Sequence, residues 1–180
     1  NYKIPDYLKQ YIDDFYPKKK FGNAIDLGCG TGLCAQLFKE KVKNIIGIDL
    51  SQKMLEIAEQ KCLYQNLIQG DIRDVLKTSN DYFDFFISAD VFIYVGDLTE
   101  IFQLVRKHSE AKSVFCFSTE QIPTGSYKLL KSGRYAHSEK YVNNLARKNG
   151  FNKVCFSEKK LRKAENNWIK GGIYVFEFNK

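Results

Sequence analysis

The sequence predicts an α/β fold with a mostly parallel sheet, an antiparallel last strand and helices on both faces. Short apolar runs alternate along the chain with segments of helical periodicity, as in parallel sheets. The first runs end in acidic residues or glycine, and a turn candidate at Asn166-Asn167 separates the last two strand-like runs. The early strands are expected at residues 24–27, 44–49, 67–69 and 83–90, and the later ones at 112–119, 153–160 and 169–178.

A glycine-rich turn follows the first apolar run. Asp26 closes that run, and Gly28, Gly30 and Gly32 follow at alternate positions before a helix expected to run to residue 40. Glycines let the backbone turn tightly and approach a ligand, and the helix start offers free N–H groups to an anion. A dinucleotide fingerprint needs glycine where this chain has Leu33. The spacing favours a different nucleotide-like ligand over a dinucleotide, and a tight turn without a ligand is the alternative.

Acidic residues end the next two apolar runs. Asp49 lies about 20 residues past the glycines, the distance at which such folds place a carboxylate on ribose hydroxyls. Its alternative role is helix capping, although Ser51 is itself a good N-cap for a helix over residues 51–61. Met54 either covers the adenine of such a nucleotide-like ligand or fills the core. Asp71 ends the third run, with a loop-capping role as its alternative.

Together these residues resemble those of the class I S-adenosylmethionine-dependent methyltransferases. The resemblance implies a Rossmann-like, seven-stranded fold that binds S-adenosylmethionine and releases S-adenosylhomocysteine. It places the adenine amino group on Asp71, the adenine ring beside Ile72, and the methionine end and the methyl acceptor after the fourth strand. Val91 is a further site candidate after the fourth strand. The cofactor-binding residues expected are Asp26, Gly28, Cys29, Gly30, Gly32, Asp49, Leu50, Met54, Asp71, Ile72, Ala89 and Asp90.

The segment 120–138 leaves the sheet at the ligand-binding end and is expected to form a loop that roofs the acceptor site. His137 is a candidate general base, since its ordinary pKa suits proton removal near neutral pH, with a hydrogen bond at the start of the next helix as the alternative. Arg134 suits an acidic acceptor group, or else packs on the surface. Tyr94 and Tyr135 are candidate substrate contacts, or else core aromatics.

Several short segments later in the chain make the resemblance more specific. They resemble the corresponding segments of the small bacterial methyltransferases that are sometimes fused to tetratricopeptide repeats, although this sequence contains no internal repeat. The segments are Gly133–Ser138, Tyr141-Val142, Leu161–Lys163 and Gly171-Gly172.

Length and composition indicate one domain over residues 1–180. With 44% hydrophobic residues, the chain can bury a core that needs no disulfides or metal ions to stabilise it. It contains no apolar run of the roughly 20 residues that cross a bilayer and no signal-like start, so we expect a cytoplasmic protein without membrane contact. An amphipathic helix near Pro5–Phe15 is expected to make residues 1–20 a lid over the cofactor. Further helices are expected at 97–109 and 138–149.

Cysteine usage argues against a metal site and against a disulfide framework. The five cysteines form no Cys-x-x-Cys pair, and the chain holds only two histidines. Cys29 is expected to be a small filler in the turn rather than a reactive thiol. The net charge of +7 is spread along the chain, so solvated lysine-rich faces explain it better than a nucleic-acid partner does.

The sequence therefore predicts methyl transfer to an oxygen or nitrogen of a small-molecule acceptor, mainly through alignment of the acceptor with the methyl group. Residues 89–92 read Ala-Asp-Val-Phe and lack the prolines of the base-amino and glutamine methyltransferases, which leaves a small molecule, with oxygen favoured. RNA or protein methylation is one alternative, favoured by the charge. A non-catalytic S-adenosylmethionine-binding protein is the other, motivated by the unsettled base. Nothing in the sequence specifies the oligomeric state.

Overall fold

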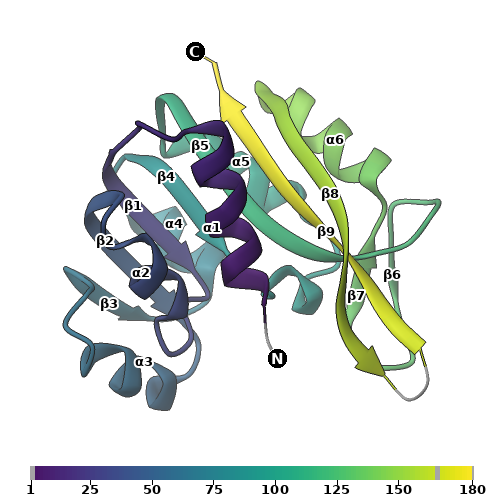
Figure 1. The fold of residues 1–180 in the computed structure, drawn as a ribbon, viewed down its shortest axis with the longest axis horizontal. Helices are drawn as coiled ribbons and strands as arrows, with labels where there is room; N and C mark the ends of the chain where they lie inside the picture. The colour runs from purple at the N-terminus through teal and green to yellow at the C-terminus, as the bar shows by residue number, and fades with distance from the viewer. Residues whose placement is uncertain (1–2, 165–166, 180) are drawn as a thin grey trace.

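One sheet with helices on both faces forms the body of the computed structural model, which describes residues 3–164 and 167–179 (Figure 1). Five parallel strands run in the order β3-β2-β1-β4-β5, β9 pairs antiparallel with β5, and β8 pairs antiparallel with β9. The strands are β1 (Phe21–Leu27), β2 (Val42–Asp49), β3 (Asn66–Gln69), β4 (Phe83–Ser88), β5 (Ser109–Gln121), β6 (Tyr127–Leu129), β7 (Tyr135–His137), β8 (Phe151–Ala164) and β9 (Asn167–Phe178).

The helices form two layers. Helices α1 and α2 cover one face of the sheet, whereas α4, α5 and α6 cover the other, and α3 lies beside β2 and β3 (Figure 1). The helices are α1 (Ile4–Phe15), α2 (Leu33–Phe38), α3 (Gln52–Glu59), α4 (Ile72–Thr78), the 3-10 helix η1 (Phe92–Tyr94), α5 (Thr99–Lys107) and α6 (Glu139–Lys148).

The sheet divides the hydrophobic core into two halves. Neighbouring residues of a strand point to opposite faces, so Phe85 packs with α1 and α2 while Phe86 packs with α5 and α6. Phe115 joins the second half in the same way. Strands β4 and β5 are thus apolar on both faces, as expected where helices cover a parallel sheet.

Helix α1 is a structural layer of the domain. Its residues Ile4, Leu8 and Ile12 are buried against α2 and the sheet. The apolar spacing thus predicted the helix correctly. Residues 3–20 contribute no residue to the wall of the cavity described below, since α1 packs on a sheet face, and the function of residues 1–20 as a lid stays a prediction.

Other elements differ from the sequence prediction. Helix α4 was not expected, because Asp71 at its start was interpreted as a ligand contact or as a loop cap, yet Asp71 accepts a hydrogen bond from the Arg73 N–H and caps the helix. Residues 120–138 form more than a loop, since β6 and β7 pair as an antiparallel hairpin. Of the turn expected at Asn166-Asn167, Asn166 lies outside the described part of the chain, and Asn167 is the first residue of β9.

The hairpin stands above the end of β4. Strand β4 pairs with one edge of β5 as far as Phe117, and β9 occupies the other edge as far as Glu120. Strand β7 pairs with Glu120 and Gln121, so it takes the β4 edge of β5 just beyond the end of β4. The topology therefore places β6 and β7 over the segment that follows Ser88.

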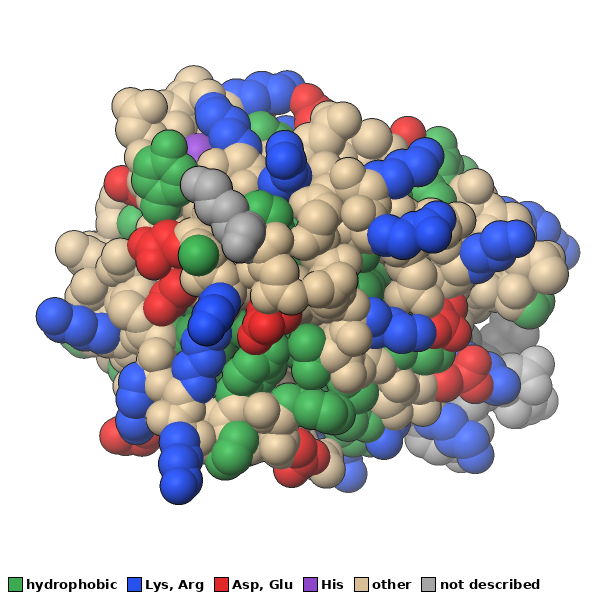
Figure 2. All heavy atoms as spheres, turned by 90° about the horizontal axis from the view of Figure 1, so that it is seen from above, with side chains coloured by type: hydrophobic (Ala, Val, Ile, Leu, Met, Phe, Trp, Pro, Cys, Tyr) green, Lys and Arg blue, Asp and Glu red, His purple; other side chains and the backbone are tan. Residues whose placement is uncertain are grey.

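Charges are mixed on the surface at which the parallel strands begin. Figure 2 looks onto this surface from the top of Figure 1 and shows Lys and Arg side chains spread over it with Asp and Glu side chains among them. The net charge of +7 therefore does not gather there into one basic patch. Among residues 3–164 and 167–179, no helix has both the length and the apolar character needed to cross a bilayer.

Candidate functional site

The glycine turn lies at the point where the strand order reverses. Strands β2 and β4 flank β1, and ligands of open α/β sheets bind outside the carboxyl ends of the strands at this position. Gly28 has a φ of +79°, and a Cβ added there would lie 2.3 Å from Val91 Cγ2. The N–H groups of Gly28 and Cys29 both donate to the carbonyl of Ile48 at 2.8 Å. Glycine is therefore needed here for its conformation and for close packing against the segment after β4.

Asp49 connects the end of β2 to the glycine turn. Its Oδ2 accepts from the Gly30 N–H at 2.8 Å, and its Oδ1 accepts from the Ser51 N–H at 2.9 Å. Ser51 caps α3 by accepting from the Met54 N–H at 3.4 Å. A carboxylate oxygen can accept two hydrogen bonds, so each oxygen of Asp49 keeps one acceptor position.

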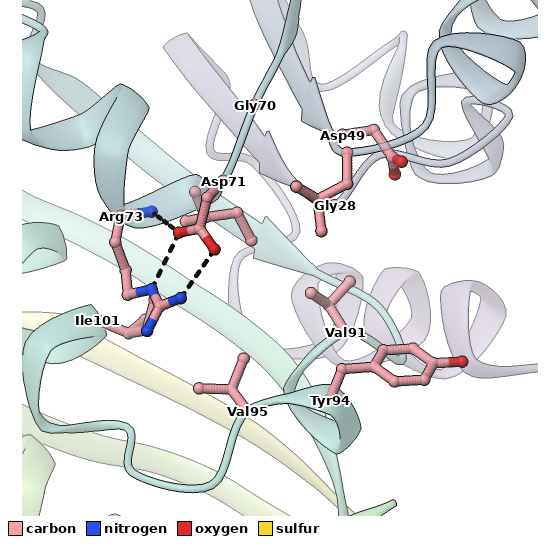
Figure 3. Close-up of a pocket in the computed structure, with 11 residues that line it drawn as sticks. Gly28, Asp49, Gly70, Asp71, Arg73, Val91, Tyr94, Val95 and Ile101 are labelled. Atoms are coloured by element: carbon pink, nitrogen blue, oxygen red, sulfur yellow. Dashed lines mark hydrogen bonds and ion pairs between the residues drawn. The ribbon is translucent and has the colours of Figure 1, made fainter.

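Asp71 forms a paired interaction with Arg73 (Figure 3). Asp71 Oδ1 accepts from the Arg73 N–H at 2.8 Å and from Nε at 2.9 Å, while Oδ2 accepts from Nη2 at 2.8 Å. These bonds to Arg73 hold the pKa of the Asp71 carboxyl below its usual range. With respect to these bonds, Oδ2 keeps one acceptor position.

These residues surround a cavity of about 300 Å³ at the carboxyl ends of β1, β2, β3 and β4. Figure 3 shows Asp71 and Arg73 on one side, Gly28 and Asp49 on another, and Val91, Tyr94 and Val95 facing them. Leu50 and Tyr94 are 70% and 66% exposed, so apolar surface is available at its rim. The lining residues are Gly28, Asp49, Leu50, Gly70, Asp71, Ile72, Arg73, Val91, Tyr94, Val95 and Ile101.

Asp26 lies beneath the glycine turn and does not line the cavity. It is 1% exposed, and its Oδ2 accepts from the Tyr64 hydroxyl at 2.8 Å. Its Oδ1 has no hydrogen-bond partner among the residues that the structure describes. Burial raises the pKa of the Asp26 carboxyl to about 7, the Tyr64 hydrogen bond opposes this shift, and the nearby Asp49 adds to it.

The other expected cofactor residues lie around the cavity rather than on its wall. Cys29 is buried, and burial raises the pKa of its thiol, which fits a small filler rather than a reactive thiolate. Met54 is 43% exposed, so it does not fill the core. Asp90, after Ala89, has a φ of +61°, and its N–H donates to Ser118 Oγ at 2.8 Å. Gly30 and Gly32 shape the turn without lining the cavity.

The structure does not bring the proposed base to this cavity. His137 is fully buried beside the rings of Tyr127 and Tyr141, which also contact each other, and its Nε2 donates to the Gly96 carbonyl at 2.9 Å. Burial lowers the pKa of its imidazole. The general-base interpretation therefore does not agree with the placement, because the ring connects the hairpin to the segment before α5.

The two remaining substrate candidates also belong to this hairpin. Arg134 and Tyr135 are half-buried and are not among the lining residues of the cavity. The Tyr135 ring packs close to Gly96, where an added Cβ would lie 2.8 Å from Cε1. Of the four residues predicted for catalysis or substrate binding, Tyr94 is the one that lines the cavity.

Sequence reasoning missed four lining residues. Gly70 precedes Asp71 and Arg73 follows it by two residues. An arginine two residues after an acid was a signal for the paired hydrogen bonds that the structure shows between Arg73 and Asp71. Val95 and Ile101 follow β4 in apolar segments whose spacing does not distinguish a cavity wall from the core. Among the described residues, no group of three or more His, Cys, Asp or Glu side chains is arranged to hold a metal ion.

The sequence is similar to those of known methyltransferases. A family model for a methyltransferase domain matches residues 24–111. A putative methyltransferase of Bacillus subtilis, YqeM, is 29% identical over 118 residues, or 62% of this chain and 47% of that protein. A malonyl-[acyl-carrier protein] O-methyltransferase of Serratia marcescens is 28% identical over 120 residues, or 66% of this chain and 46% of that protein. The chain thus spans about half the length of the curated relatives it matches.

Solved structures share the complete fold at low identity. A putative S-adenosylmethionine-dependent methyltransferase from Listeria monocytogenes has a TM-score of 0.76, with 19% identity and 97% of each chain covered. The N-methyltransferase NodS from Bradyrhizobium japonicum, in complex with S-adenosyl-L-homocysteine, has a TM-score of 0.75 at 16% identity, with 97% of this chain and 87% of that chain covered. The chain has the fold of these S-adenosylmethionine-dependent methyltransferases, and its residues 24–111 match the family model for a methyltransferase domain.

Proposed function

We propose that this chain binds S-adenosylmethionine in the cavity at the carboxyl ends of β1 to β4 and transfers its methyl group to an oxygen or nitrogen of a small molecule. The observation that carries the proposal is that Gly28, Asp49 and Asp71 all line the same cavity. Each follows or ends a different parallel strand, and each presents the group that one part of the ligand needs.

The adenosine part fits the side of the cavity between β2 and β3. The two acceptor positions left on Asp49 suit the two ribose hydroxyls, one on each carboxylate oxygen. The acceptor position left on Asp71 Oδ2 suits the adenine amino group. Leu50 and Ile72, both on the cavity wall, supply apolar contact for the ring.

The methionine part fits the glycine turn. The free N–H groups at the start of α2 suit its carboxylate, and the negative potential of ionised Asp26 suits its ammonium group. The unpartnered Oδ1 of Asp26 supports this fit, because buried carboxylate oxygens normally have a donor. The reactive end is then directed toward the segment after β4, where Ala89 and Asp90 lie.

The acceptor is proposed to bind under the β6–β7 hairpin, which stands over this segment. Tyr94 at the cavity mouth is the best placed side chain to contact it. Relatives named as O-methyltransferases of malonyl-[acyl-carrier protein] and of ubiquinone biosynthesis favour an oxygen acceptor. Arg134, on the same hairpin, stays a proposed partner for an acidic group of the acceptor.

Alignment is the main contribution that the protein makes in this proposal. The bound donor supplies an electrophilic methyl group, which is already activated by its sulfonium. The side chains hold the donor, orient the acceptor and exclude water, effects that together can exceed several kcal/mol. Because His137 is buried and bonded to the Gly96 carbonyl, we propose that it holds the β6–β7 hairpin in position. We therefore expect acceptors that ionise without a histidine base.

Two measurements test the proposal. Calorimetry should show saturable binding of S-adenosylhomocysteine and no binding of NADH, and the opposite pattern would overturn it. Transfer of labelled methyl from S-adenosylmethionine should appear in a metabolite pool. Label in RNA with salt-sensitive binding would favour the macromolecular alternative, which the net charge of +7 and a relative named as an uncharacterized RNA methyltransferase support. Binding without transfer to any extract would favour a non-catalytic binding protein.

A further inference from the structure

Tyr64, in the connection between α3 and β3, packs its ring between the glycine turn and β2. A Cβ added to Gly32 would lie 3.0 Å from Tyr64 Cε2, and a Cβ added to Gly47 would lie 2.9 Å from Tyr64 Cε1. Each glycine therefore leaves space that the ring fills. Gly47 lies inside β2, where a glycine weakens a strand unless another group approaches closely. The tyrosine ring supplies that approach together with Leu67 Cδ2, which would lie 2.8 Å from the added Cβ, and Cys29 Sγ, which would lie 2.9 Å from it.

The hydroxyl of Tyr64 reaches the buried acid below the turn. It donates to Asp26 Oδ2 at 2.8 Å, and Oδ1 has no partner among the described residues. The titratable groups that act on Asp26 are Tyr64 and Asp49, and Asp26 in turn raises the pKa of the thiols of Cys29, Cys34 and Cys116. None of these groups is a cation. Tyr64 is thus the hydrogen-bond donor that the described structure gives to this carboxylate.

We propose that Tyr64 is a positioning residue for the methionine end of S-adenosylmethionine, because its ring supports the glycine turn and its hydroxyl fixes the Asp26 carboxylate beneath it. The inference rests on the proposed function and adds to it a residue that does not line the cavity. The ligand's ammonium is favoured by ionised Asp26 through Coulomb attraction, which is strong where water is excluded. The Tyr64 hydrogen bond stabilises that ionised form.

The sign of the pH dependence follows from this arrangement. The pKa of Asp26 is raised to about 7, so affinity for a ligand ammonium should rise as the pH increases through that value. Removal of the Tyr64 hydroxyl removes an effect that lowers the Asp26 pKa. The midpoint of the affinity profile should therefore move to higher pH in Tyr64→Phe.

The test is S-adenosylhomocysteine binding by calorimetry from about pH 5.5 to 8.5, a range around the Asp26 value. Tyr64→Phe keeps the ring, and its melting curve checks that it folds. It should bind about 3- to 10-fold more weakly at neutral pH, the size of one lost hydrogen bond, with its midpoint moved upward. The exposed Tyr82→Phe is the matched control and should reproduce the unmodified protein.

Asp26→Asn supplies a second, independent measurement. The affinity of Asp26→Asn for S-adenosylhomocysteine should not change across the same pH range. The double variant that also carries Tyr64→Phe should show an equally flat profile. Weaker binding by Tyr64→Phe with an unchanged midpoint would show a purely structural tyrosine and overturn this inference alone. A complete lack of binding by the unmodified protein would instead overturn the proposed function together with it.

Discussion

Replacing Gly28 with Ala separates the two physical requirements of the glycine turn. The added methyl meets Val91 Cγ2 at 2.3 Å and Cγ1 at 2.9 Å, and the backbone φ is +79°. The left-handed conformation costs a non-glycine residue about 1–2 kcal/mol. Overpacking against Val91 adds about 1–3 kcal/mol, so the total loss in the free energy of unfolding is about 2–5 kcal/mol.

Gly30→Ala is the matched control, because Gly30 has a φ of +54° and no atom would lie within 4 Å of its added Cβ. It should cost only the backbone contribution of about 1–2 kcal/mol. Urea unfolding of both variants measures the difference, and Val91→Ala should recover the steric part when combined with Gly28→Ala. Equal losses in Gly28→Ala and Gly30→Ala, or no recovery in the double variant, would refute the steric reasoning.

Three further predictions concern Asp26, His108 and Leu50. Because Asp26 keeps its proton in the folded state up to a pKa of about 7, against 3.8 ordinarily, its contribution to stability is full below pH 3.8 and is lost as the pH rises to about 7. Urea unfolding at several pH values should show a smaller decline in Asp26→Asn, by up to about 1.4 kcal/mol per pH unit, and parallel curves would contradict this. His108, 2% exposed, bonds through its two ring nitrogens to the carbonyls of Asp81 and Leu76 at 2.7 Å. His108→Ala should lower the free energy of unfolding by about 2–4 kcal/mol, and a loss under about 0.5 kcal/mol would show that these bonds are unimportant. Leu50→Ala should weaken S-adenosylhomocysteine binding about 3- to 10-fold in calorimetry without changing the melting temperature, since Leu50 is 70% exposed on the cavity wall, and unchanged affinity would remove it from the site.

The parts of the fold that the sequence predicted are those with a strong local pattern. Buried parallel strands are continuous apolar runs, so β1 to β5 were recognised, and their order along the chain followed from the polar residues at their ends. Gly28, Asp49 and Asp71 were placed on the site for the same reason, because carboxyl ends of parallel strands meet at one edge.

The failures have physical causes as well. Strands β6 and β7 have three residues each, too few to show a period. His137 lies at the correct end of the sheet, but a single residue's position does not tell whether its ring points into a cavity or into the core. Tyr64 could have been suspected from Gly47, a glycine inside an otherwise apolar strand, since such a residue indicates a close approach by another group.

The length of β5 has a consequence for how an acceptor could enter. From Val114 to Phe117 this strand is hydrogen-bonded on both edges, and at Glu120 it pairs with β9 and with β7. A strand held in this way cannot bend without breaking several ladders at once. Any movement that admits the proposed acceptor should therefore occur between Gln121 and Tyr127 rather than in β5. It would have to break the hydrogen bonds from the Ile122 N–H to the His137 carbonyl at 3.2 Å and from the Ser138 N–H to the Ser126 carbonyl at 3.0 Å. Stiffening that short stretch should slow product release more than it changes the affinity for the methyl donor.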